Sequence, residues 1–167
     1  MELILALHNI RSTYNVGAIL RTAEGFGVKS AIFSGYTPTP LPASKALPHI
    51  AEKETAAIHK TALGAEEMVP SEWSDDIETT LNDLKAKGYT IIGLENNLKD
   101  ARLHSLNEQG LILPEKTVLL LGEEVHGIPA ELLPLVDLFL EIPMKGKKES
   151  FNVSVATGIA LYELLAR

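Results

Sequence analysis

The sequence predicts an α/β fold with a mostly parallel sheet and helices on both of its faces. Five short apolar runs alternate with helical patterns along the chain, which is the order that produces parallel βαβ units. Most of these runs are continuously apolar, which is typical of strands covered on both faces. The length of 167 residues suits one core, so we expect a single domain over residues 1–167.

The expected strands are "LILALH" (3–8), "SAIFSG" (30–35), "YTIIGLE" (89–95), "TVLLLG" (117–122) and "VDLFLEI" (136–142). The expected helices are roughly 15–25, 52–63, 75–87, 129–135 and 151–166. A proline-rich loop at 35–42 and an irregular stretch at 96–110 interrupt this pattern. Open α/β sheets bind ligands at the carboxyl ends of their strands, so the loops that follow the strands are the candidate site.

Composition excludes several classes of protein. The chain is 46% apolar and 22% charged, which is an ordinary globular balance, and it has no cysteine for a disulfide or a thiolate metal site. No apolar run approaches the ~20 residues that cross a bilayer. The start "MELILALHNIRS" lacks the basic lead of a signal peptide. A cytoplasmic protein is therefore the default expectation. The five histidines are scattered without ligand spacing, so we expect no metal site.

The net charge of −7 argues against indiscriminate binding of nucleic acid. The charges are unevenly distributed: no lysine or arginine lies between Lys60 and Lys85, whereas Lys145, Lys147 and Lys148 cluster tightly. A basic face on an acidic body is one interpretation, and a solvated acidic helix with a solvated lysine loop is the other.

The first motif, "HNIRSTYNVGAILRTAEGFGV", leads from the first strand into a helix that opens near Asn15. Gly17 and Arg21 fall on the polar side of this helix, one turn apart. We expect the Arg21 side chain to reach over Gly17 toward the helix start, where free N–H groups favour anions. The motif is either a capped amphipathic helix with a solvent-facing arginine, or an Asn15–Arg21 pair that binds a phosphate or a sugar hydroxyl.

The second motif, "LLLGEEVHGIP", leads from a buried strand into a loop that contains Gly122, Glu124 and Gly127. Its two glycines allow backbone shapes or a close ligand approach that other residues forbid. Its spacing matches neither a P-loop nor a dinucleotide fingerprint. His126 lies beside it, although a lone loop histidine is more often a surface residue than a catalytic one.

The third motif, "IPMKGKKESFNVSVATGIALYELL", ends in a helix that is apolar nearly all round from Val153 onward. Such a helix must be covered on every face, which indicates the body of the domain on one side and a partner subunit on the other. Ser150 and Asn152 lie at its start. A cap needs one such residue, so the excess of hydroxyl and amide groups here indicates a ligand.

Together, "NVGAILRTAEGFG", "LLLGEEVHGI" and "IPMKGKKESFNVSVATGI" resemble the three ordered motifs of the SpoU (TrmH-like) branch of the SPOUT RNA methyltransferases. The resemblance implies an α/β fold with a deep C-terminal trefoil knot, S-adenosylmethionine as methyl donor and a homodimer formed through the C-terminal helix. It also implies 2′-O-methylation of a ribose in RNA, with tRNA favoured over rRNA because the sequence resembles the minimal tRNA-modifying members.

The resemblance also implies roles for particular residues. Arg21, Asn15, Glu124, Ser150 and Asn152 match the polar active-site positions, and Leu94, Gly122, Ile142, Phe151 and Ser150 match the cofactor pocket. Arg21 is the family's candidate for contacting the substrate phosphate and assisting proton removal. A guanidinium is a poor base, so the first role is preferred. Phe151 replaces the usual Leu or Met, and "HNIRSTYNVG" departs from the usual "NPxNVG".

Two alternatives from other classes remain open. One is a catalytically idle RNA-binding relative, which the complete set of polar active-site residues argues against. The other is a base-modifying or unrelated nucleotide-binding α/β enzyme, for which the sequence offers no acid–base pair and no metal cluster. The sequence identifies neither the RNA nor the nucleotide.

Overall fold

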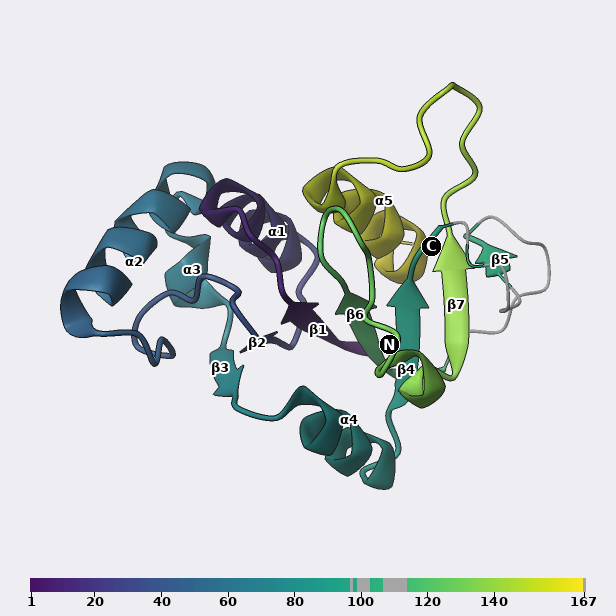
Figure 1. Cartoon of the computed structure of the whole chain (residues 1–167), viewed down its shortest axis with the longest axis horizontal. Coiled ribbons are helices and arrows are strands. Elements are labelled where there is room, and N and C mark those ends of the chain that lie inside the picture. Colours follow the sequence, from purple (N-terminus) through teal and green to yellow (C-terminus); the bar gives the residue numbers. More distant parts are fainter. Residues whose placement is uncertain (97, 99–102, 107–113, 167) are drawn as a thin grey trace.

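The computed structural model describes residues 1–96, 98, 103–106 and 114–166. These residues form a seven-stranded sheet in the order β3-β2-β1-β6-β4-β7-β5, in which every pair of neighbours is parallel (Figure 1). The strands are β1 Glu2–His8, β2 Ser30–Ser34, β3 Ser71–Ser74, β4 Thr90–Leu94, β5 Leu103–Ser105, β6 Lys116–Leu121 and β7 Leu138–Glu141. The helices are α1 Thr13–Gly25, α2 Pro48–Ala62, α3 Ala65–Met68, α4 Ile77–Ala86, the 3-10 turn η1 Leu133–Leu135 and α5 Val153–Leu165.

The sheet has a hydrophobic core on each face, which confirms the predicted fold class. Strand β1 supplies Leu3, Leu5 and Leu7 to one core and Ile4 and Ala6 to the other, as alternation along a strand requires. The first core is closed by α1, α2, α3 and α5, and the second by α4 and the segment from β6 to η1 (Figure 1).

All five expected strands are present, but two further strands are not predicted by periodicity. Strands β3 and β5 have only four and three residues and lie at opposite edges of the sheet. Strand β3 reads "SEWS", so it has no apolar run to reveal it. Strand β5 falls inside the stretch 96–110 that we expected to be irregular, and most of that stretch lies outside the described residues.

Four of the five expected helices are present, and the prediction of a helix at 129–135 is wrong. Only the 3-10 turn Leu133–Leu135 forms there. Pro134 lies inside the segment, and a proline in a helix interior removes a hydrogen bond and clashes with the preceding turn. The sequence also gave no indication of the one-turn helix α3.

The prediction that Gly17 and Arg21 share the polar side of α1 is partly wrong. Gly17 is buried, and a Cβ atom on it would overlap the Thr61 side chain and the carbonyl oxygen of Ile58 in α2. Gly17 therefore allows α1 and α2 to cross closely. The Arg21 side chain is exposed on α1 as expected, but the space over Gly17 is filled by α2 and does not lead to the helix start.

Candidate functional site

A cavity of about 490 Å³ lies at the carboxyl ends of the neighbouring strands β6, β4 and β7. This is the edge where parallel α/β sheets bind ligands, and the volume is in the range of small-molecule sites. Its walls are the strand ends, the loop after β6 and the segment before α5. The lining residues are Leu94, Glu95, Asn96, Leu121, Gly122, Glu123, Glu124, Val125, His126, Gly127, Ile142, Glu149, Ser150, Phe151, Asn152, Val153 and Ala156.

The five residues predicted to hold a cofactor all line this cavity: Leu94, Gly122, Ile142, Ser150 and Phe151. They come from the end of β4, the end of β6, the end of β7 and the segment before α5. Segments that are far apart in the sequence are therefore brought to one concave surface.

The residues predicted to be catalytic divide into two groups. Glu124, Ser150 and Asn152 line the cavity, and Asn15 contacts two of them. Arg21 does not line the cavity, and among the described residues it has no hydrogen-bond or ion-pair partner. The structure of a single chain thus brings four of the five together and leaves Arg21 apart on the exposed side of α1.

A short hairpin shapes the loop after β6. Glu123 and Gly127 exchange two backbone hydrogen bonds, with N···O distances of 3.0 and 2.9 Å, and Gly127 has a positive φ of 72°. A Cβ atom on Gly122 would overlap the backbone of Gly127 and Ile128. Gly122 therefore permits the loop to fold back on itself, which is the first of the two roles, backbone shape or close ligand approach, that the sequence left open.

Glu95 holds the same hairpin from the opposite side. Its carboxylate accepts a hydrogen bond from the Ile128 N–H at 2.9 Å and lies against Gly127. Glu95 is the last residue of the strand expected at 89–95, and no functional role was predicted for it. A carboxylate directly after a buried strand was the available indication.

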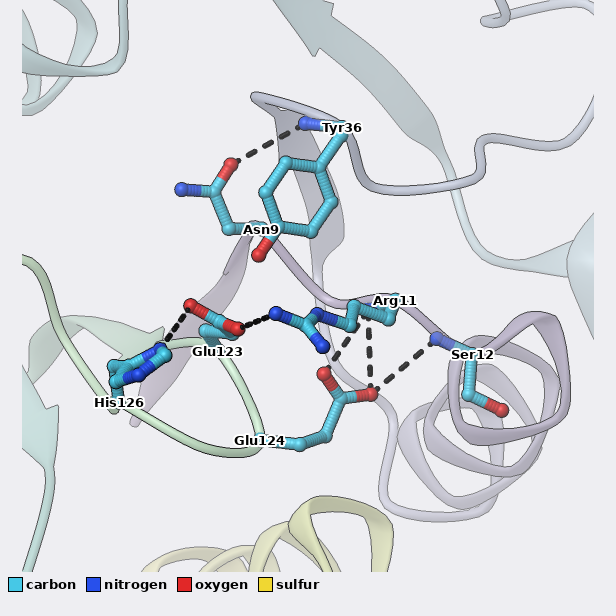
Figure 2. Close-up of polar contacts among 7 residues, drawn as sticks. All are labelled: Asn9, Arg11, Ser12, Tyr36, Glu123, Glu124 and His126. Atoms are coloured by element: carbon cyan, nitrogen blue, oxygen red, sulfur yellow. Dashed lines mark hydrogen bonds and ion pairs between the residues drawn. The ribbon is translucent and has the colours of Figure 1, made fainter.

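A chain of hydrogen bonds links the first, second and third motifs. Glu124 accepts backbone N–H bonds from Arg11 (3.0 and 3.2 Å) and Ser12 (3.3 Å), and a bond at 2.9 Å from the Asn15 amide. The Asn15 amide oxygen in turn accepts a bond at 3.2 Å from the Asn152 amide. Figure 2 shows Glu124 directed at Arg11 and Ser12.

The same contacts determine the charge of Glu124. Burial acts to raise its pKa, but the hydrogen bonds from the Arg11 backbone, the Asn15 amide and the Ser12 backbone outweigh burial and lower the pKa below its usual value. Glu124 is therefore an ionised acceptor whose oxygens are aimed by three donors, and it fixes which way the Asn15 amide faces.

Asn96, which no sequence pattern marked as functional, joins the end of β7 to the segment before α5. Its amide donates to the carbonyl oxygens of Ile142 (3.1 Å) and Glu149 (3.3 Å), and its side-chain oxygen accepts from the Ile142 N–H (3.2 Å). Asn96 thereby closes the base of the protruding segment between β7 and α5 that Figure 1 shows.

Most of the polar excess at the start of α5 is used within the helix. Asn152 caps the helix by accepting from the Ser154 N–H at 2.9 Å, and its side-chain oxygen also accepts from the Ser154 hydroxyl at 2.7 Å. The Thr157 hydroxyl donates to the carbonyl oxygen of Val153 at 2.7 Å. Of the hydroxyl groups that suggested a ligand, only Ser150 is left facing the cavity.

The cavity wall is acidic and apolar. Four of its lining residues are glutamates, Glu95, Glu123, Glu124 and Glu149, and no lysine or arginine is among them. Lys145, Lys147 and Lys148 are exposed on the protruding segment outside it. Such a wall favours a ligand with positive charge and apolar surface, and it disfavours a phosphate group.

No helix in residues 1–96, 98, 103–106 or 114–166 combines the length and the apolar character needed to cross a bilayer.

Comparison with known proteins agrees with this geometry. The model of the SpoU rRNA Methylase family matches residues 2–162. A 23S rRNA (guanosine-2'-O-)-methyltransferase RlmB from Pseudomonas aeruginosa is 33% identical over 165 residues, which are 99% of this chain and 59% of that protein. The chain thus spans less than two thirds of that relative.

Solved structures give the same result. An AdoMet-bound rRNA methyltransferase from Sinorhizobium meliloti superposes with a TM-score of 0.76 at 25% identity, covering 97% of this chain and 55% of that one. A structure described for the 2-OH methylation of C/U34 on tRNA superposes with a TM-score of 0.71 at 25% identity, covering 99% and 98% of the two chains.

Proposed function

Because the chain belongs to the SpoU rRNA methylase family, we propose that it is an S-adenosylmethionine-dependent methyltransferase that acts on a ribose 2′-hydroxyl of RNA. The observation that carries the proposal is the cavity of about 490 Å³ with an acidic and apolar wall at the carboxyl ends of β6, β4 and β7. S-adenosylmethionine carries a sulfonium and an ammonium group against one carboxylate, so it is a net cation without phosphate and its charge suits this wall.

The residues that would hold the cofactor are Leu94, Gly122, Ile142, Ser150 and Phe151. The apolar side chains offer surface for a planar base, and the backbone at Gly122 offers polar groups for its edge. When bound, S-adenosylmethionine supplies the methyl group of a sulfonium, and transfer of that methyl leaves a neutral thioether.

The polar chain Glu124–Asn15–Asn152 would orient the ribose. The ionised Glu124 fixes the Asn15 amide, and Ser150 offers a hydroxyl at the same cavity, so the three motifs present hydrogen-bonding groups to a sugar hydroxyl. In our proposal Arg21 contacts an RNA phosphate rather than accepting the proton, because a guanidinium stays protonated. Lys145, Lys147 and Lys148 would add attraction that is independent of sequence and weakens with salt.

We favour tRNA as the substrate and keep rRNA as the second candidate. The solved structure described for methylation of C/U34 on tRNA matches this chain over 98% of its own length. The rRNA candidate rests on the RlmB relative, of which this chain covers 59%.

We also propose a homodimer formed through α5. Thr157, Ala160, Leu161 and Leu164 of α5 are buried within the chain, whereas Val155 and Tyr162 are 50% and 57% exposed. A second copy would cover these apolar side chains. The trefoil knot and the cytoplasmic location stay predictions.

The test is to incubate the purified protein with methyl-labelled S-adenosylmethionine and either tRNA or ribosomal RNA from cells that lack it. We expect label in one RNA, recovered as a 2′-O-methyl nucleoside after digestion. Label on a base would replace the proposal with base methylation. Cofactor binding in titration without any labelled RNA would favour an idle RNA-binding relative.

A further inference from the structure

A group of exposed side chains at the rim of the cavity shares one carboxylate. We use "rim cluster" for Arg11, Tyr36, Glu123 and His126 (Figure 2). The Glu123 side chain is only 13% exposed; one of its oxygens binds the Arg11 guanidinium and the other lies 3.0 Å from His126 Nδ1. The side chains of Arg11 and His126 are 59% and 76% exposed. Glu123 therefore fixes two planar groups that face solvent.

Tyr36 belongs to the same group, although it comes from the loop after β2. Its backbone N–H donates to the Asn9 side chain at 3.3 Å, and its ring extends beside Arg11 with the hydroxyl toward Glu123 (Figure 2). Tyr36 is 51% exposed. The hydrogen bond to Tyr36 and the charge of Glu123 both raise the pKa of Arg11, and His126 and Arg11 lower the pKa of Glu123.

The rim cluster adjoins the site proposed for the ribose. Glu123 and His126 line the cavity, and the Arg11 backbone N–H binds Glu124, which holds Asn15. A nucleotide whose sugar lies at Asn15 and Glu124 would thus have the rim cluster within reach of its base.

The chemistry of these side chains suits a nucleobase. Unstacked bases of RNA are bound by stacking on aromatic rings or on guanidinium planes and by hydrogen bonds to their edges. Because the chain has a net charge of −7, its overall charge repels RNA, and binding therefore needs specific contacts to bases in addition to local attraction for phosphates.

We propose that the rim cluster binds the unstacked base of the RNA nucleotide that is methylated, with Tyr36 and Arg11 as the stacking surface and Glu123 as the positioning residue. The inference rests on the proposed function, because that function places RNA at this edge of the sheet.

The test measures affinity for RNA separately from catalysis. The variants are Tyr36→Ala, Tyr36→Phe and Glu123→Gln, with His49→Ala on the exposed face of α2 as the control for a lost surface ring. Fluorescence anisotropy with a labelled RNA stem–loop and with a blunt RNA duplex gives the two Kd values. Calorimetric titration gives the Kd for S-adenosylmethionine.

We expect Tyr36→Ala to weaken stem–loop binding by about 5- to 150-fold, which is the range for one stacked base. Tyr36→Phe should retain most of the affinity because it keeps the ring. Glu123→Gln should weaken stem–loop binding less than Tyr36→Ala. Duplex binding and cofactor affinity should stay within about twofold in Tyr36→Ala, Tyr36→Phe and His49→Ala, whose residues do not line the cavity.

Equal losses for stem–loop and duplex would overturn the proposal, because they would indicate contacts to the RNA backbone. Unchanged stem–loop binding in Tyr36→Ala, or a loss of cofactor affinity as large as the loss for RNA, would also overturn it. The proposed function fails by a different observation, namely that the wild-type protein labels no RNA.

Discussion

Gly122→Ala tests whether the hairpin after β6 is the cofactor wall. The added Cβ would overlap the carbonyl group of Gly127 and the nitrogen of Ile128, which are backbone atoms and cannot rotate away. Either the overlap is tolerated as strain, at about 1–3 kcal/mol, or the hairpin opens. Opening breaks the two Glu123–Gly127 hydrogen bonds, worth about 1 kcal/mol each.

Both routes give a loss of about 2 kcal/mol in the free energy of unfolding, which corresponds to a fall in Tm of about 4–8 °C for a chain of this size. Because the displaced residues line the cavity, the affinity for S-adenosylmethionine should fall at least about tenfold, equivalent to about 1.4 kcal/mol. Urea unfolding followed by circular dichroism and calorimetric titration measure the two effects.

Gly146→Ala is the matched control, because a Cβ atom at Gly146 meets nothing within 4 Å. It should leave both quantities near the wild-type values. If Gly122→Ala unfolds at the same urea concentration as Gly146→Ala, the inferred close contact of Gly122 with the Gly127 and Ile128 backbone is wrong. If it is destabilised but binds the cofactor normally, the hairpin is not the cofactor wall.

Four further predictions concern other parts of the chain. Arg21→Ala should lower turnover about 100-fold and leave the cofactor Kd unchanged; an equal loss of both would refute its assignment to the RNA. Gly17→Ala should cost about 1–3 kcal/mol in urea unfolding because α2 covers Gly17, whereas Gly25→Ala in the same helix, with open space around it, should gain up to about 1 kcal/mol. Burial acts to raise the pKa of Glu66, but hydrogen bonds from His59 and the Gly64 backbone outweigh burial and lower the pKa below 4.5. The contribution of ionised Glu66 to folding stability is therefore present above pH 4.5 and is lost as the pH falls. The urea midpoints of wild type and Glu66→Gln should therefore converge as the pH falls below 4.5, and a constant difference would refute this. Tyr162→Glu should turn the dimer into a monomer in light scattering, and an unchanged mass would exclude α5 as the interface.

Local sequence features account for the elements with strong patterns. The long apolar runs appear as β1, β6 and the other central strands, and the helices expected at 15–25 and 151–166 appear as α1 and α5. Strands β3 and β5 were not predicted because an edge strand of three or four residues needs no apolar run.

The sequence by itself determined the fold class and two segments that line the cavity, the loop after β6 and the segment before α5, because burial on both faces of a parallel sheet leaves continuous apolar runs with polar loops at their ends. The tertiary structure alone decided which of those loops meet. Strand β6 pairs with β1 and β4, and not with β5 or β7, which precede and follow it in the sequence. This order brings Arg11 to Glu123 and Glu124. It likewise decided that Gly17 and Gly122 face backbone, because such contacts depend on strand and helix neighbours that no local periodicity records.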